Sequence, residues 1–196
     1  MYARWRRQWM SSLDSIFEEL RQQFKTPDAL NPAKSDPLFY FVHAPEDTLE
    51  LKKRIPLWIA KFREDGKEVE VVSFADLLWQ IIDASGRWDD WLESEPTEEP
   101  EQINRAVKDA VRSGNALVEA VARHLDSALP NRVLFLVDAA LVHPYFRLRT
   151  LVSGLHDRVK LPAIIFYPGR RSGQYGLRFL GFYPEDPNYR SSLIGD

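Results

Sequence analysis

The chain has 196 residues, 44% of them hydrophobic and 28% charged, which is the composition of a globular protein with one full core. It contains no cysteine, and this excludes disulfides, thiolate zinc sites and cysteine nucleophiles. A formal net charge of −3 gives no sign of nucleic-acid binding by bulk attraction. No apolar run approaches the roughly 18 residues that span a membrane. We therefore expect a single cytoplasmic domain over residues 1–196, with no membrane partner.

An amphipathic helix is expected over residues 1–26, packed on this domain or extending from it. Its apolar residues recur at steps of three and four and form one stripe. They are Trp5, Trp9, Leu13, Ile16, Phe17, Leu20 and Phe24. Arg4, Arg6 and Arg7 lie beside the two tryptophans. The alternative to a simple packing role is a contact of these arginines with nucleic acid or a membrane surface.

Strands and helices alternate along the rest of the chain. The expected strands are 38–42, 69–72, 132–139, 162–167 and 177–183, and the expected helices are 48–63, 74–82, 103–125 and 144–157. Ser73 is expected to cap the second of these helices. Pro56 is expected to kink or split the first, and Ser113-Gly114 to bend the third.

The segment 88–101 has a different composition, because it is acidic and is interrupted by Pro96 and Pro100. Such stretches are usually exposed loops, and we expect one here. Trp88 and Trp91 anchor either this loop or a partner.

Alternation of strands and helices predicts an α/β fold with three layers, in which helices cover both faces of a mostly parallel sheet. The expected strand order resembles that of RecA and the P-loop NTPases. Those proteins hold phosphate with G-x-x-x-x-G-K-[ST] after the first strand. Here that place reads HAPEDTLELKKR, which has no glycine and carries Glu46 and Asp47. The phosphate loop is absent, and we expect no cofactor, no metal and no catalytic residue.

One alternative is an enzyme, or a nucleotide or metal binder, at the edge of the sheet. Asp138 ends the third predicted strand like the acid of a Walker B strand, although Ala139 follows it instead of Glu. His43 and His143 each follow a strand, and parallel strands direct such residues to the edge where ligands bind. The alternative therefore uses His43, Asp138 and His143.

The loop PGRRSGQYG is a second candidate site. Gly169, Gly173 and Gly176 permit unusual backbone angles, and Arg170 and Arg171 can hold an anion or an acidic partner. The alternative is a hairpin turn with two solvated arginines. A third interpretation, a DNA contact, uses these two arginines with the three near the N-terminus.

The C-terminal third has a distinctive series of motifs: a strand, an aromatic-Pro-Gly turn, a glycine-containing loop, a second strand and a final Asn-Tyr-Arg. The residues that form it are Phe166, Tyr167, Pro168, Gly169, Gly173, Leu177, Phe179, Gly181, Asn188, Tyr189 and Arg190. In this series the chain resembles the BrxB proteins of BREX phage-defence systems. This chain has Tyr-Arg where the family pattern has Tyr-Tyr. The segment VLFLVDAALVHPYFRLRTLVSGLHD also looks like the family's strand, proline-containing loop and helix.

This resemblance implies a non-catalytic adaptor that works beside other BREX components, among them a PglZ-type protein, an adenine methyltransferase and a large ATPase. The expected partner is the PglZ-type protein. The residues expected to bind it are Tyr167, Pro168, Gly169, Arg170, Arg171, Gly173, Tyr189 and Arg190.

Overall fold

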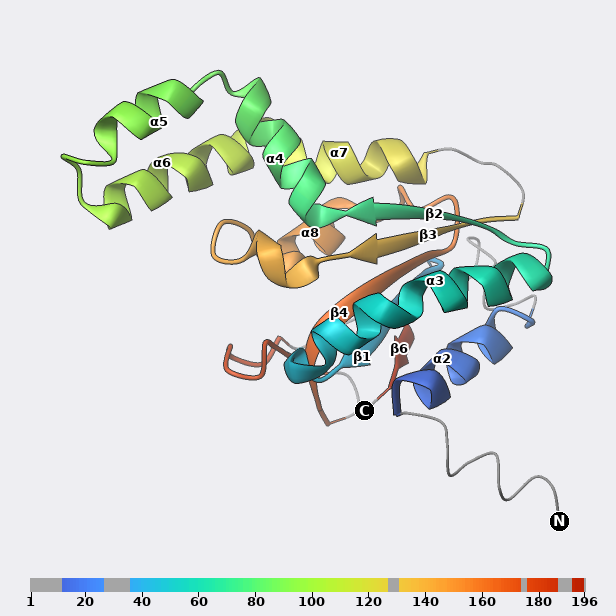
Figure 1. The fold of residues 1–196 in the computed structure, drawn as a ribbon. Helices are drawn as coiled ribbons and strands as arrows, with labels where there is room; N and C mark the ends of the chain where they lie inside the picture. Colours follow the sequence, from blue (N-terminus) through green and yellow to red (C-terminus); the bar gives the residue numbers. More distant parts are fainter. Residues whose placement is uncertain (1–11, 27–35, 127–130, 174–175, 187–191, 196) are drawn as a thin grey trace, which may run out of the picture.

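The computed structural model describes residues 12–26, 36–126, 131–173, 176–186 and 192–195. Its sheet has the order β2-β3-β4-β1-β6, and β5 pairs with the end of β4 (Figure 1). The strands are β1 (Leu38–His43), β2 (Glu68–Ser73), β3 (Arg132–Val137), β4 (Ala163–Ser172), β5 (Gly176–Phe179) and β6 (Ser192–Ile194). Every pairing is parallel except that of β4 with β5. The mostly parallel sheet is therefore confirmed, with β4 between β1 and β3.

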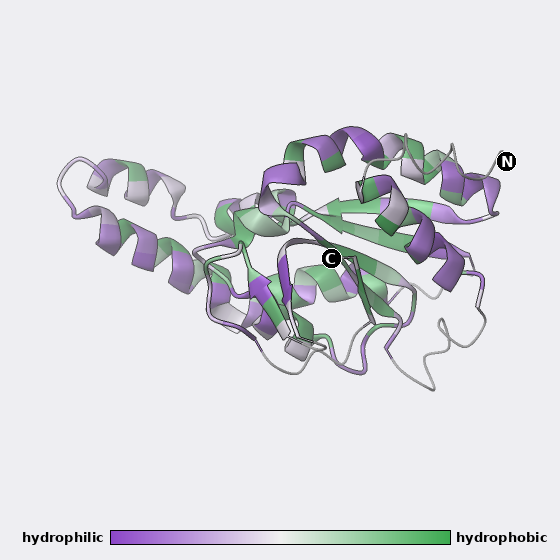
Figure 2. Ribbon diagram, turned by 90° about the horizontal axis from the view of Figure 1, so that it is seen from below, coloured by the Kyte–Doolittle hydropathy of each residue, from purple (hydrophilic) through white to green (hydrophobic). Residues whose placement is uncertain are grey.

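Helices cover both faces of this sheet, which confirms the three layers. The helices α2 (Ser12–Gln23) and α3 (Thr48–Glu64) lie on one face, and α4 (Phe74–Ala84), α7 (Ala116–Leu125) and α8 (Leu148–Gly154) lie on the other (Figure 1). In β1, Phe39 and Phe41 pack into the first layer, while Tyr40 and Val42 pack into the second. This alternation buries both faces of the strand, as a continuous apolar run predicts. Figure 2 shows apolar strands between helices whose outer faces are polar.

The acidic segment that we expected to be a loop is largely helical. It forms α5 (Trp88–Ser94) and the start of α6 (Pro100–Arg112), and the two helices project beyond the sheet as a hairpin (Figures 1 and 2). Asp89 and Asp90 lie in the first turn of α5, where negative charge favours a helix. Pro100 lies in the first turn of α6, where the missing N–H costs nothing. The loop prediction from composition was wrong because acidic residues and proline are favoured in the first turn of a helix as well as in exposed loops.

Two predicted helix interruptions have different outcomes. Pro56 does not split α3, which runs on to Glu64. Leu51, Trp58 and Phe62 are all buried, so packing on the sheet holds the turns on both sides of the proline in one helix. The break near Ser113-Gly114 is confirmed. There the 3₁₀ turn η3 (Ser113–Asn115) separates α6 from α7, and Gly114 has a φ of 58°.

The C-terminal elements differ from prediction in their bounds. β4 continues through Ser172, so five of the nine residues of the expected PGRRSGQYG loop lie in β4, and Gly176 begins β5. β5 ends at Phe179, and the expected helix 144–157 is shortened to α8. Two short elements were not predicted, β6 and the 3₁₀ turn η4 (Ala139–Val142). β6 is only three residues long, which is too short for a periodic pattern.

Candidate functional site

The parallel strands β1 and β3 end, and β4 passes, beside a hollow of about 220 Å³ at the carboxyl edge of the sheet. Its lining includes His43, Lys52, Asp138, Phe166 and Pro168. The edge is where open parallel sheets bind ligands. The structure thus brings together two of the three residues of the predicted edge site, His43 and Asp138.

Asp138 is bound on both of its carboxylate oxygens. Lys52 Nζ lies 2.5 Å from Oδ1, and Ser73 Oγ donates a hydrogen bond of 2.7 Å to Oδ2. Ser73 also caps α4, as predicted, because its Oγ accepts from the Ala75 N–H at 3.2 Å. Asp138 therefore joins α3, β2 and the end of β3. Its φ of 64° is a left-handed conformation that Asp tolerates better than most residues.

His43 is the most buried polar side chain at this edge, with 3% exposure. Its Nδ1 lies 2.9 Å from the carbonyl oxygen of Ala44, so that nitrogen carries the proton. Burial lowers the pKa of His43 below its ordinary value, against smaller opposing effects of the Ala44 hydrogen bond and the Asp47 charge. The neutral imidazole is therefore the form that the fold stabilises.

His143 lies in a different hollow, of about 260 Å³, so its predicted grouping with His43 and Asp138 is wrong. The reason is η4, which carries the chain away from the end of β3 before His143 is reached. Its Nε2 lies 2.9 Å from the Tyr183 hydroxyl, and desolvation lowers its pKa. Four basic residues also line this second hollow: Lys108, Arg112, Arg147 and Arg149.

The predicted partner-binding residues divide into buried and exposed ones. Tyr167, Pro168 and Gly169 are buried in β4. A Cβ at position 169 would meet the Arg178 carbonyl oxygen at 2.5 Å, so glycine is required where β5 pairs with β4. Because these three residues are buried, they can hold neighbouring surface residues in place but cannot contact a partner themselves.

The other described residues of the set follow directly in β4 and its turn, and they are exposed or, in the case of Arg171, half-buried. Arg170 is exposed and lies 3.6 Å from Glu46, while Arg171 donates to the Gly195 carbonyl at 3.1 Å. Gly173 is exposed, with a φ of 63°. Tyr189 and Arg190 lie outside the described residues, as do Arg4, Arg6 and Arg7.

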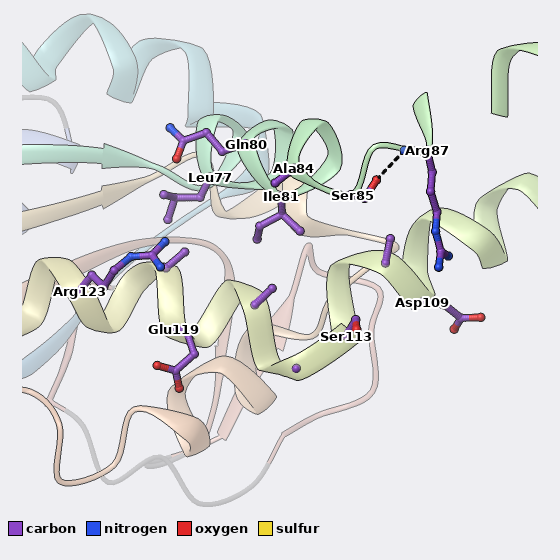
Figure 3. Close-up of a pocket in the computed structure, with 14 residues that line it drawn as sticks. Leu77, Gln80, Ile81, Ala84, Ser85, Arg87, Asp109, Ser113, Glu119 and Arg123 are labelled. Carbon is purple, nitrogen blue, oxygen red and sulfur yellow. Dashed lines mark hydrogen bonds between the residues drawn. The ribbon is translucent and has the colours of Figure 1, made fainter. Parts of the chain in front are cut away.

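One further hollow was not predicted from the sequence. It has a volume of about 710 Å³ and lies between α4 and the α6–η3–α7 segment (Figure 3). Arg87, Asp109, Glu119 and Arg123 are the charged residues of its lining. Glu119 is paired with Arg158 at 2.7 Å, which accounts for one of these charges. Because the lining carries charges of both signs and the hollow is open, its residues do not indicate one class of ligand.

One set of side chains in the described ranges has the spacing of metal ligands: Asp36, His156 and Asp157. His156 Nδ1 lies 3.0 Å from Asp36, and its Nε2 lies 3.5 Å from Asp157. All three are wholly or partly exposed at the edge where β1 begins, away from the hollow with His43. The geometry is that of a surface histidine between two carboxylates.

Comparison with known proteins assigns the family. The profile of the family described as BREX protein BrxB matches residues 70–194. A curated relative described as "BREX protein BrxB", from Bacillus cereus (strain H3081.97), is 24% identical over 162 residues, which cover 81% of this chain and 83% of the relative. No solved structure matches the fold. Within the described residues, no helix is long and apolar enough to cross a membrane. The family profile covers well over half of the sequence, and this chain belongs to the BrxB family.

Proposed function

We propose that this chain is a cytoplasmic component of a BREX phage-defence system and acts there as a non-catalytic adaptor that binds a PglZ-type protein. The observation that carries the proposal is membership of the BrxB family, whose description names BREX. β4 lies between β1 and β3, and this position supports a RecA-like strand order. The adaptor would thus use a fold of the nucleotide-binding type for binding a protein.

The chemistry of the sheet edge supports a role without catalysis. The turn after β1 supplies Glu46 and Asp47, whose charges oppose phosphate binding. Asp138 already has a cation and a hydroxyl on its two oxygens, from Lys52 and Ser73. The edge thus lacks the residues of a phosphate loop, and the contacts of Asp138 instead link α3 and β2 to the end of β3.

Exposed Arg170 and Gly173 supply, with half-buried Arg171, the accessible part of the surface that the family resemblance implies for the partner. They lie on the β4–β5 hairpin, next to the turn that carries Glu46. An arginine with an exposed guanidinium recognises carboxylates through paired hydrogen bonds, which suits an acidic surface on the PglZ-type protein.

Co-purification tests the adaptor role. The tagged full-length chain is co-expressed with the PglZ-type protein of the same genome and passed over a sizing column. We expect a stable complex in defined stoichiometry, and the Arg170→Ala, Arg171→Ala double variant to weaken it. Elution of the two proteins as separate species would contradict the adaptor role.

The competing function is a nucleotide or metal binder that uses His43 and Asp138, and one observation favours it: both residues line the same hollow with Lys52. That function predicts a rise in melting temperature on addition of ATP with Mg²⁺, or of Mn²⁺ alone, because a ligand that binds only the folded state stabilises it. The rise should vanish in Asp138→Asn. An unchanged melting temperature would remove this candidate.

A further inference from the structure

A further hollow surface, whose lining includes no residue of the β4–β5 hairpin, lies where α4 meets the α5–α6 hairpin. This groove has a volume of about 420 Å³ and is lined by α4, α5, α6 and the segment after β3. Of the eight large hydrophobic side chains that are exposed in the described residues, four line it. They are Trp79 (51% exposed), Trp88 (41%), Leu92 (49%) and Leu141 (52%). Single exposed apolar residues are ordinary, whereas their gathering in one groove marks a binding surface.

The aromatic residues of the groove are held in place by packing. The rings of Trp79 and Trp88 meet edge to face, with centroids 5.4 Å apart. Trp91, on the same short helix as Trp88, is buried with 8% exposure and also lines the groove. Tryptophan is enriched among the residues that dominate binding energy at protein interfaces. The groove therefore offers a pre-formed pair of anchor side chains.

The α5–α6 hairpin, which supplies one wall of the groove, is strongly acidic over residues 88–102. Seven carboxylates occur between Trp88 and Gln102, and no lysine or arginine occurs there. They are Asp89, Asp90, Glu93, Glu95, Glu98, Glu99 and Glu101. All seven are exposed, and within the described ranges none of them forms an ion pair. Unpaired like charges repel nucleic acid and attract a basic protein surface.

From the apolar groove and the acidic hairpin beside it we infer that this groove binds an amphipathic helix of a partner protein, whose apolar face fills the groove and whose flanks carry Lys or Arg. Walls made of helices suit a helix that lies along them, with apolar anchors spaced at three and four residues. The inference rests on the proposed function only in taking the chain to be a binding component, and it names the surface and the chemistry of the partner.

The first test uses the PglZ-type protein as the binding partner. Trp79→Ser with Leu92→Ser removes two anchors, and we expect the complex with the full-length chain to weaken by about tenfold or more. Leu57→Ser with Phe182→Ser is the matched control, because both residues are exposed and lie outside the groove. Equal binding by the groove variant and the wild type would overturn the inference and leave the adaptor role standing.

The second test does not depend on that partner. Two synthetic helical peptides of about five turns share one leucine face, and their flanks carry either lysine or glutamate. We expect the lysine peptide to bind the wild-type chain, and the triple variant Asp89→Lys, Asp90→Lys, Glu93→Lys to prefer the glutamate peptide instead. Absence of this reversal would overturn the inference.

Two further outcomes separate the inference from the proposed function. Binding of the lysine peptide by a chain that forms no complex with the PglZ-type protein would refute that partner and support the groove. Dimerisation of the wild-type chain that the Trp79→Ser, Leu92→Ser variant loses would show that a second copy fills the groove, and this would overturn the inference.

Discussion

At the scale of single residues, Asp138 is the side chain that joins the most elements at the sheet edge. Its contacts with Lys52 and Ser73 link two strands and a helix. We expect Asp138→Ala to lower the free energy of unfolding by about 1–3 kcal/mol, because it removes both contacts and places alanine at positive φ. Lys52 is 46% exposed, so solvent screening keeps its share of this loss small.

Denaturant unfolding measures this loss. Asp138→Asn is the informative companion, since asparagine tolerates the left-handed conformation and can still accept from Ser73. It should cost less than alanine. Glu46→Ala serves as the control, because its pair with Arg170 is exposed and should contribute less than about 0.5 kcal/mol. A loss for Asp138→Ala no larger than that of the control would refute the structural role of the aspartate.

His43 gives the fold a pH dependence with a definite sign. Burial lowers its pKa in the folded state, so the unfolded chain binds a proton more readily as the pH falls through the ordinary histidine range. The stability contributed by the neutral imidazole is present above the unfolded pKa of about 6.5 and is lost progressively below it. His143, whose pKa is also lowered, adds to the same trend.

We therefore expect the free energy of unfolding to fall between pH 7.5 and pH 5. Asparagine can donate to the Ala44 carbonyl but has no proton to gain, so His43→Asn should make this pH profile flatter. The measurement is denaturant unfolding of both proteins at several pH values. Parallel profiles would show that His43 is not the group responsible.

At the scale of elements, α2 is held by an aromatic cluster on α3. Phe17 stacks on Trp58 with ring centroids 4.8 Å apart, and both side chains are fully buried. Asp14 accepts hydrogen bonds from Trp58 Nε1 at 3.1 Å and from Arg54 at 2.6 Å. These contacts make α2 part of the core layer on this face of the sheet.

Phe17→Ala should therefore destabilise the protein by about 3–5 kcal/mol, the usual cost of deleting a buried aromatic ring. Glu19→Ala, on the exposed side of the same helix, should change the stability by less than about 0.5 kcal/mol. Thermal and denaturant unfolding of the two variants give the comparison. A mild effect of Phe17→Ala would mean that α2 is not anchored as described.

The α5–α6 hairpin should be the least protected helical part of the described chain. α5 buries one residue, Trp91, whereas α7 buries six. Local opening is easiest where few apolar contacts hold an element, so we expect amides of α5 to exchange hydrogen much faster than those of α7. Hydrogen-exchange mass spectrometry measures this, and binding of a helix in the groove should slow the exchange in α5. Equal protection of the two helices would contradict this description.

The sequence predicted the layers and the parallel sheet because their signals are strong and local. Continuous apolar runs such as 132–137 are diagnostic of central strands, and Ser73 has the chemistry of a helix cap. The acidic hairpin was missed because its residues suit exposed loops and helix starts equally well. β6 was missed because pairing with β1, and not its own three residues, makes it a strand.

The candidate site was predictable only in part. Parallel strands placed His43 and Asp138 at one edge, as expected from the topology. The ion pair with Lys52 depends on how α3 packs across β3, which no spacing in the sequence reports. The groove with Trp79 and Trp88 likewise depends on the angle between α4 and the hairpin.

At the scale of the whole molecule, we propose that this BrxB protein works by binding and not by catalysis. The most direct measurement is the plating efficiency of phage on cells that carry the complete system with variants of this chain. The edge variant His43→Asn, Asp138→Asn removes the candidate catalytic groups, and the groove variant Trp79→Ser, Leu92→Ser removes the binding anchors. Melting temperature and cellular level are measured for both, so that loss of folding is recognised. We predict full protection with the edge variant and loss of protection with the groove variant. A folded edge variant, present at the wild-type level, that no longer protects the cells would contradict the account.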